Sequence, residues 1–170
     1  MLRRWLPLSA AAVGLVLLIT GSVLALLDAT HQRPQAAGLP PRLAGLELAS
    51  WSDGPQAVAE LGRMHAADIA LESAAIGRYG DAGQVVLWIS KMPDSAAASN
   101  MTEAMRSRIN AVDSPYTQVA LRPRQAGPIT ELEGTGQRHY FYASDSIVIW
   151  LGAEPALAEQ ALVNLQEMYP

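Results

Sequence analysis

Cysteine is absent from the 170-residue chain. Its absence excludes disulfide bridges, iron–sulfur clusters, zinc sites with cysteine ligands and lipid attachment to a cysteine near the N-terminus. It does not indicate a redox compartment, because both exported and cytosolic domains can lack cysteine. Lysine is nearly absent as well: Lys91 is the single example beside eleven arginines. We attribute this bias to genome composition and not to a binding role.

Sequence motifs of catalysis and cofactor binding are also missing. The chain has no G-x-S-x-G nucleophile turn, no phosphate-binding loop and no dinucleotide fingerprint. From Ala44 onward there are 8 basic and 15 acidic residues, a net charge of −7. Such a charge repels nucleic acid and anionic lipid headgroups. We therefore predict no cofactor and no nucleic-acid partner.

One uncharged run of 23 residues, Trp5–Leu27, lies near the N-terminus. A bilayer core of about 30 Å needs about 20 helical residues, so this run is long enough to span it. Arg3 and Arg4 precede the run and Asp28 follows it, which places residues 1–4 in the cytoplasm and the rest of the chain outside. We predict an uncleaved single-pass anchor in the cell membrane. A cleaved signal peptide is the alternative, although its apolar region is normally shorter, and it gives the same orientation.

Small residues form a stripe on this predicted membrane helix. The stripe consists of two pairs with four-residue spacing, Ala10 with Gly14 and Gly21 with Ala25. Such stripes allow two helices to approach closely, so these four residues are candidate packing positions for a membrane partner or a homodimer. Glycine and alanine are also frequent in membrane helices without a partner, and that alternative stays open.

Residues 28–43 are polar and contain three prolines, so we predict an extended linker there. Residues 44–170 are predicted to form one extracytoplasmic α+β domain. Apolar alternation, turn residues and helix-opening prolines predict the order of its elements. Strands are expected at 43–51, 72–79, 84–90, 116–121, 129–133 as a short edge strand, 136–143 and 146–151. Helices are expected at 55–67, 93–111 and 155–170.

Two segments match without a gap at an offset of 62 residues. Residues 85–93 and 147–155 align Trp88 with Trp150, and each ends on a helix-opening proline. We therefore predict two strand–strand–helix repeats, at about 72–111 and 136–170, although a chance match is the alternative. Side by side, such repeats give an antiparallel sheet with helices mainly on one face.

The two matched strands are apolar at every position, whereas a strand with one wet face alternates. By strand geometry, Val86, Trp88, Val148 and Trp150 point to one face and their neighbours point to the other. Something must therefore cover the second face, which the helices of the repeats do not reach: the first strand and helix, a protein partner or second copy, or a ligand. Our hypothesis is that the face with both tryptophans is a recognition surface. The alternative is that both tryptophans are core residues.

Histidine and acidic residues are the candidates for chemistry. His65 and Asp68 lie three residues apart, and His139 lies on a predicted strand. These residues could bind a metal or serve a hydrolase, but zinc needs three or four ligands and no known spacing is present. Glu131 and Glu133 alternate on a strand and could form a carboxylate pair, although a solvated strand is the simpler interpretation. We therefore predict no metal site.

Together these features favour a membrane-anchored, extracytoplasmic binding or interaction module without catalysis of its own. The first alternative is an extracytoplasmic hydrolase or metal-binding protein that uses His65 and His139. The second is an accessory subunit of a larger membrane complex, bound through the stripe of small residues.

Overall fold

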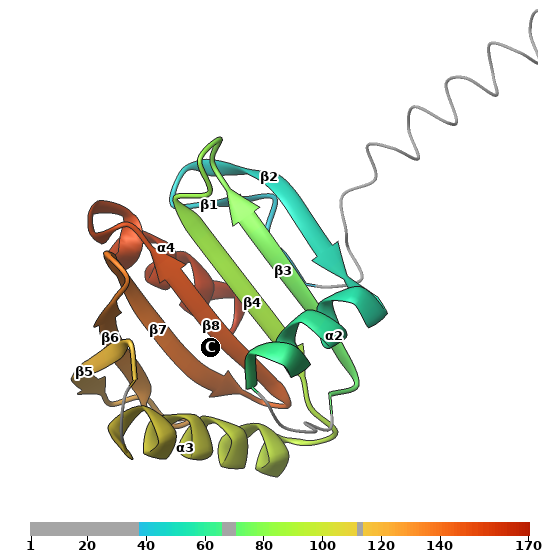
Figure 1. Cartoon of the computed structure of the whole chain (residues 1–170), viewed down its shortest axis with the longest axis vertical. Helices are drawn as coiled ribbons and strands as arrows, with labels where there is room; N and C mark the ends of the chain where they lie inside the picture. The colour runs from blue at the N-terminus through green and yellow to red at the C-terminus, as the bar shows by residue number, and fades with distance from the viewer. Residues whose placement is uncertain (1–37, 66–70, 112–113) are drawn as a thin grey trace, which may run out of the picture. The chain divides into compact units, whose positions relative to one another are not determined.

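The computed structural model describes residues 38–65, 71–111 and 114–170. They form an α+β domain built on one curled antiparallel sheet (Figure 1). The strands are β1 (Arg42–Leu43), β2 (Leu46–Asp53), β3 (Ser73–Tyr79), β4 (Val85–Lys91), β5 (Tyr116–Arg122), β6 (Ile129–Gly134), β7 (Gln137–Ser144) and β8 (Ile147–Ala153). The helices are α2 (Gly54–His65), α3 (Ser95–Ala111) and α4 (Pro155–Met168). The predicted α+β class and antiparallel sheet are confirmed.

The strand order is β1-β2-β3-β4-β8-β7-β6-β5, and every neighbouring pair is antiparallel. The chain builds one half of the sheet before α3 and the other half after it. The halves join where β4 pairs with β8, and Trp88 lies directly opposite Trp150 in that pairing. The predicted edge strand at 129–133 is interior, because β6 pairs with both β5 and β7. The edge is β5.

Local sequence signals explain where two helices and one hairpin begin. Asp94 caps α3, since its Oδ1 accepts a hydrogen bond from the Ala97 N–H at 2.7 Å. Pro155 stands in the first turn of α4, where its fixed φ suits a helix and its missing N–H leaves no bond unmade. Between β6 and β7, Thr135 and Gly136 both have positive φ, as a two-residue type I′ turn requires.

One face of the sheet packs against α4 and forms the largest core cluster among the described residues. It joins alternate side chains of the central strands to three fully buried tyrosines, Tyr79, Tyr140 and Tyr142. The buried residues of α4 complete it: Ala158, Ala161, Leu162 and Leu165. Each fully buried leucine stabilises the folded state by about 1.5–3 kcal/mol, so this cluster dominates the hydrophobic stabilisation of the domain.

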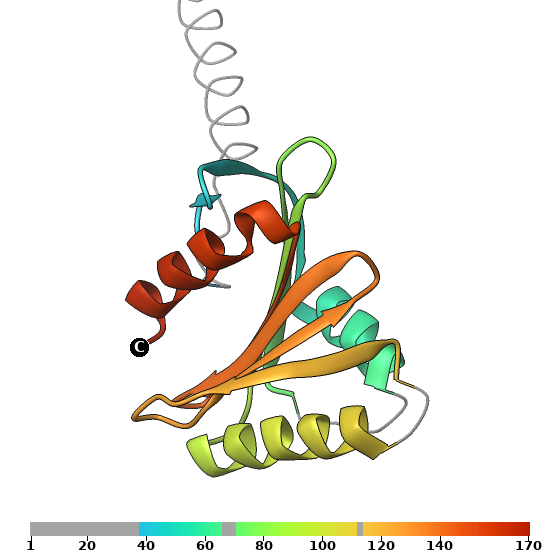
Figure 2. The same cartoon turned by 90° about the vertical axis from the view of Figure 1, so that its left-hand side faces the viewer.

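The opposite face carries α2 and α3 (Figure 2). Helix α2 packs over Ala74 and Ile76 of β3, whereas α3 packs over Phe141 and Val148 of β7 and β8. The expectation of helices mainly on one face is met by α2 and α3 but not by α4. The two helices that follow the matched strands therefore lie on opposite faces, and the idea that they share one is wrong. The physical reason is that the central strands are apolar on both faces, so each face needs a helix.

The domain includes residues that were expected in the linker. Leu39 and Leu43 are buried in the core on the α4 side. The Tyr79 hydroxyl donates to the Pro40 carbonyl at 3.0 Å and fixes the segment between them. Residues 38–43 therefore pack as part of the domain. The predicted anchor at 5–27 lies outside the described residues, and within those residues no helix has the length and apolar character needed to cross a bilayer.

Candidate functional site

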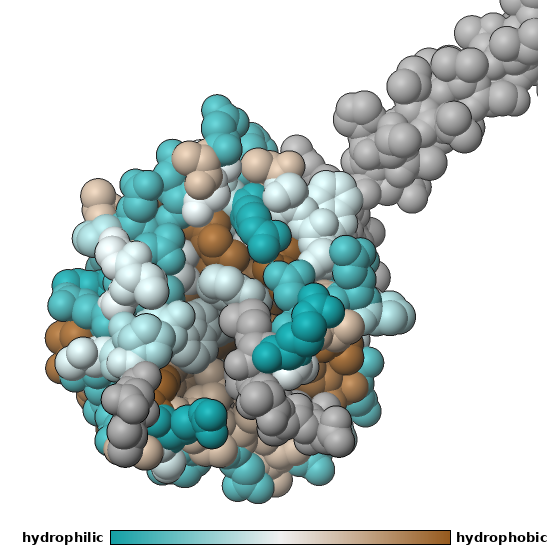
Figure 3. Space-filling view, in the orientation of Figure 1, coloured by the Kyte–Doolittle hydropathy of each residue, from teal (hydrophilic) through white to brown (hydrophobic). Residues whose placement is uncertain are grey.

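The candidate recognition surface lies on the sheet face that carries α2 and α3, and we call it the tryptophan face. It is defined by the four residues predicted to share a face: Val86, Trp88, Val148 and Trp150. Their common orientation is confirmed by the core clusters on this side of the sheet. Val148 is buried, whereas the other three are half-buried. Figure 3 looks onto this face and shows hydrophobic atoms recessed near its centre, between more polar side chains.

Trp150 is held by a cluster of aromatic rings. It stacks on Phe141 with ring centroids 5.3 Å apart and planes 11° apart. The Tyr116 ring meets it edge-on at 5.4 Å, and the His139 ring lies 5.9 Å away. The Trp150 Nε1–H donates to His139 Nδ1 at 3.2 Å. Aromatic pairs of these geometries each contribute about 0.5–1.5 kcal/mol beyond burial, so Trp150 is fixed in place.

Trp88 has a different environment, although it lies directly across from Trp150. It packs against the small cluster of α2 and β3, which contains Leu61 and Ile76. No ring contact and no hydrogen bond of its indole N–H is found among the residues that the structure describes. This half-buried ring therefore retains an unused donor. Of the two tryptophans, Trp88 is held by fewer specific contacts.

Gly152 lies on the tryptophan face beside Val86, and the His139 ring occupies the space that a side chain at this position would need. The two residues are register partners in β8 and β4. A Cβ built on Gly152 would lie 2.9 Å from the His139 ring, closer than real Cβ contacts. Any larger residue at this position must displace the histidine, so glycine is required here for packing and not for its backbone freedom.

His139 is a buried residue whose ring nitrogens are both engaged. It is 2% exposed. Its Nδ1 accepts from Trp150, which leaves the proton on Nε2, 3.3 Å from the Gly134 carbonyl that accepts it. Burial lowers the pKa of His139, against the smaller opposing effect of the Gly134 hydrogen bond. A neutral, fully bonded imidazole cannot bind a metal or accept a proton without breaking one of these bonds.

The other predicted site residues lie outside the described part of the chain, or their side chains do. His65 is the last residue of α2 and its side chain is not described, and Asp68 lies outside the described residues, as do Ala10, Gly14, Gly21 and Ala25. Whether His65 and Asp68 approach His139 therefore stays a prediction. Across 38–65, 71–111 and 114–170, no three histidine, aspartate or glutamate side chains gather as a metal ion requires.

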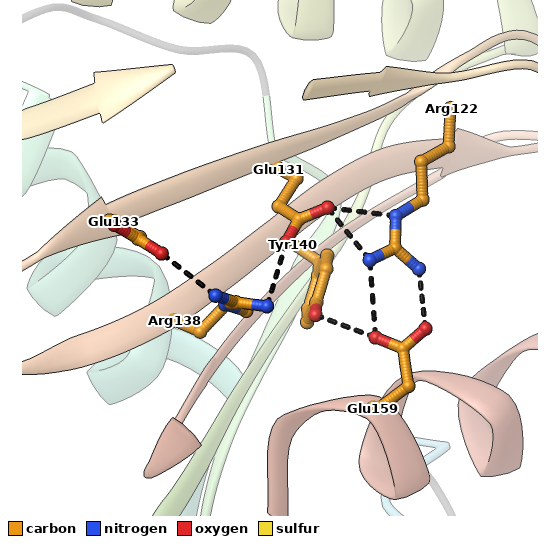
Figure 4. A network of polar contacts seen from close by, with 6 residues as sticks. All are labelled: Arg122, Glu131, Glu133, Arg138, Tyr140 and Glu159. Carbon is orange, nitrogen blue, oxygen red and sulfur yellow. Dashed lines mark hydrogen bonds and ion pairs between the residues drawn. The ribbon is translucent and has the colours of Figure 1, made fainter. Parts of the chain in front are cut away.

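A network of charged residues occupies the α4 side of β5, β6 and β7 (Figure 4). At its centre Glu131 is 4% exposed. Arg122 donates to it from Nε at 2.8 Å, and Arg138 Nη1 lies 3.2 Å from it. Arg122 also pairs with Glu159 of α4 at 2.5 Å, and the Tyr140 hydroxyl donates to the same carboxylate at 2.9 Å. Glu131 is thus not the solvated residue that the sequence suggested.

Each acidic group of this network has a cationic partner, which decides what it can do chemically. Glu133, the other member of the predicted carboxylate pair, is exposed and pairs with Arg138 at 2.8 Å. The hydrogen bond from Arg122 lowers the pKa of Glu159, and burial raises the pKa of Tyr140 to about 12. A general acid needs a pKa near the operating pH, and these shifts move both groups away from it. The network ties α4 to the outer strands.

Sequence reasoning missed Tyr116 and Phe141 as neighbours of Trp150, and the central position of Glu131. Phe141 is the register partner of Trp150 in the β7–β8 hairpin, so the two-residue turn predicted between those strands is the signal that could have found it. Tyr116 and Glu131 have no such local signal, because they lie on β5 and β6, which are not adjacent to β8 in the sheet. A comparison of the chain with protein-family models, with curated proteins and with solved structures finds no match.

Proposed function

We propose that this chain is a membrane-anchored, extracytoplasmic binding module, and that its tryptophan face receives the ligand or protein partner. One observation carries the proposal: Trp88 is half-buried at the centre of the sheet, and its N–H has no partner among the residues that the structure describes, whereas Trp150 beside it is held by aromatic rings and a hydrogen bond. Apolar surfaces with a few oriented polar groups are the usual form of binding sites. Tryptophan is also enriched among the residues that dominate binding energy.

The position in the membrane is supported by the sequence. An uncharged segment of spanning length, with arginines before it and an aspartate after it, is what a single-pass anchor with an outside C-terminal domain needs. The binding function is favoured over the hydrolase or metal-binding alternative because both ring nitrogens of His139 are engaged within the protein.

We infer further that the domain consists of two strand–strand–helix repeats. The matched strands β4 and β8 are neighbours, and their register is symmetric about the Trp88–Trp150 pair: Leu87 faces Leu151 and Ile89 faces Ile149. A two-fold relation between two copies produces this register. The helices α3 and α4 depart from that relation, since they cover opposite faces. A duplication followed by divergence of one helix accounts for both observations.

The binding proposal is tested by photo-crosslinking in the native membrane. Arg78 is exposed on the tryptophan face as the register partner of Val86, and Val163 is similarly exposed on α4. A photo-reactive amino acid at position 78 should give a specific adduct that position 163 does not give. The substitution Trp88→Ala should remove the adduct from position 78, while Val163→Ala should not.

Two results would contradict the proposal: the same adducts from both positions, or an adduct at position 78 that survives Trp88→Ala. The circular dichroism spectrum and melting temperature of each variant control for unfolding. Because Trp88→Ala removes a large side chain, Trp88→Phe provides a milder second variant, which keeps an apolar ring and lacks the N–H donor.

A further inference from the structure

The tryptophan face carries one cationic side chain close to Trp88. Two rows of register partners cross the sheet on this face, one through Trp88 and the other through Val86. Within the described strands, Arg78 is the only aspartate, glutamate, lysine or arginine in either row. The domain as a whole has a net charge of −7, so this cation at the centre of the sheet runs contrary to the overall charge. Its sign points to an anionic ligand.

Arg78 and Trp88 lie diagonally across β3 and β4. Arg78 is the register partner of Val86, and Trp88 lies two residues beyond Val86 on the same face. Diagonal neighbours in antiparallel strands are about 7–8 Å apart, within the reach of long and aromatic side chains. A guanidinium, an apolar side chain and an indole ring therefore lie side by side on this face, near enough for one small molecule to contact all three.

The guanidinium of Arg78 is only weakly engaged within the protein. Its side chain is 44% exposed, and its single ion pair among the described residues is with Glu60 of α2 at 3.5 Å. Exposed pairs contribute little to stability, so a carboxylate from a ligand can replace Glu60 at small cost. By contrast, Arg122 and Arg138 on the opposite face each hold two carboxylates. Arg78 is thus the arginine with donors to offer.

We propose that the tryptophan face binds a small monocarboxylate with a flat apolar body, its carboxylate on Arg78 and its body against Trp88 and Val86. This inference rests on the proposed function and names the ligand class of the same site. A guanidinium donates two parallel hydrogen bonds to a carboxylate, and a flat ring packs well on an indole. The negative charge of the domain disfavours a doubly charged phosphate more than a singly charged carboxylate.

The test compares three probes that share one ring and differ in charge: naphthylacetate, naphthylethanol and naphthylethylamine. Their binding to the full chain in phosphatidylcholine nanodiscs is measured by isothermal titration calorimetry, and empty nanodiscs correct for partition into lipid. Charge-assisted hydrogen bonds should make the acid bind about tenfold more tightly than the alcohol. The amine should bind no better than the alcohol.

Four variants assign this preference to residues. Arg78→Gln should reduce the affinity of the acid to that of the alcohol. Arg42→Gln is the matched control, since Arg42 is also an exposed strand arginine paired with a glutamate, and it should change nothing. Trp88→Ala should weaken the acid and the alcohol equally. Glu60→Gln removes the competing carboxylate and should strengthen the acid by about two- to fivefold.

Equal binding of acid and alcohol by the native chain overturns the inference, as does a preference for the acid that survives Arg78→Gln or is lost equally in Arg42→Gln. Weaker binding of the acid to Glu60→Gln also overturns it. The alcohol is the internal control for folding, because its affinity should not change in Arg78→Gln. A photo-reactive residue at position 78 removes the guanidinium, so the crosslinking test detects a partner held by Trp88 without Arg78. A Trp88-dependent adduct without a preference for the acid therefore overturns this inference and leaves the proposed function standing.

Discussion

Trp88 and Trp150 occupy matching positions in the two halves of the sheet, yet the protein uses them differently. Trp150 has a stacked ring below it, an aromatic edge beside it and a hydrogen bond to His139. Trp88 packs against the apolar cluster of α2 and β3, and within the described part of the chain its ring has no aromatic contact and its N–H no hydrogen bond. The same residue type, on the same face and in the same register, is therefore held by aromatic stacking and a hydrogen bond in one half and by apolar packing in the other.

The contrast extends to the polar contacts of the two halves. The strands after α3 are joined to each other and to α4 by the network around Glu131. The corresponding strands before α3 have ion pairs only between exposed or half-exposed side chains, such as Lys91 with Glu72 at 3.1 Å. Exposed pairs contribute about 0–1 kcal/mol each. We infer that the half with Trp150 contributes more of the polar stabilisation of the domain, and our proposal assigns binding to the half with Trp88.

The largest expected effect separates the two tryptophans directly. Trp150→Ala removes a stacked ring and leaves the Nδ1 of His139 without its donor. It should lower the free energy of unfolding by about 3 kcal/mol, at the lower end of the cost of truncating a core aromatic residue, because the Trp150 ring is half-buried. Trp88→Ala should lower it by about 1–2 kcal/mol, because the half-buried ring has fewer contacts to lose. Urea denaturation followed by circular dichroism measures both values, and equal losses would remove the contrast.

A second comparison tests the polar network that distinguishes the halves. Glu131→Ala leaves two arginines without their buried partner, which should lower the free energy of unfolding by about 2 kcal/mol. This is below the cost of breaking a fully buried ion pair, because both arginines are about one-third exposed. Glu133→Ala, two residues along the same strand, should cost less than about 1 kcal/mol. A cost for Glu131→Ala no greater than that of Glu133→Ala would show that the network does not stabilise this half.

Local sequence signals were enough to locate the elements of the domain. The apolar runs that became β4 and β8, the proline before α3 and the proline that opens α4 predicted strands and helices within a few residues of their observed bounds. Period-two geometry also predicted which residues share the tryptophan face, because successive side chains alternate regardless of what packs on them. These features depend on neighbouring residues only, so one sequence contains them.

Long-range packing accounts for what the sequence did not predict. Which face of the sheet α3 packs against depends on the curl of β5, β6 and β7. That curl is set by contacts between residues far apart in the chain. The cluster of Tyr116, His139 and Trp150 forms for the same reason. The alternation of Glu131 and Glu133 predicted a solvated strand, because a solvent-exposed edge strand and a strand covered on one face can have the same alternating pattern. In the structure its carboxylate is buried between Arg122 and Arg138, which neutralise its charge.

The pH dependence of stability tests the hydrogen bond that fixes Trp150. Burial holds the pKa of His139 below its ordinary value of 6.5, so below that pH the unfolded chain binds more protons than the folded one. The contribution of His139 should be fully present above pH 6.5 and should decline as the pH falls toward the lowered pKa. The shifted carboxylate Glu159 acts in a lower window, since its pKa lies below its ordinary value of 4.5.

The measurement is a series of urea midpoints between pH 8 and pH 5 for the native chain and for His139→Gln. The variant loses the titrating group, so the part of the slope due to this residue should disappear even if the variant is less stable at every pH. An unchanged slope would show that His139 does not resist protonation in the folded state, and that its bond to Trp150 does not distinguish the two tryptophans.

The smallest expected effect is spectroscopic, and it compares the two indoles without unfolding the protein. In chains with Trp5 and Trp51 replaced by Phe, a further Trp150→Phe leaves only Trp88, and Trp88→Phe leaves only Trp150. Acrylamide should quench the fluorescence of Trp88 more strongly than that of Trp150, because three aromatic rings shield the latter. Saturation of the tryptophan face by its ligand should then protect Trp88 and leave Trp150 unchanged. Equal quenching of both indoles would make Trp88 a core residue and would remove the basis for a binding surface at this position.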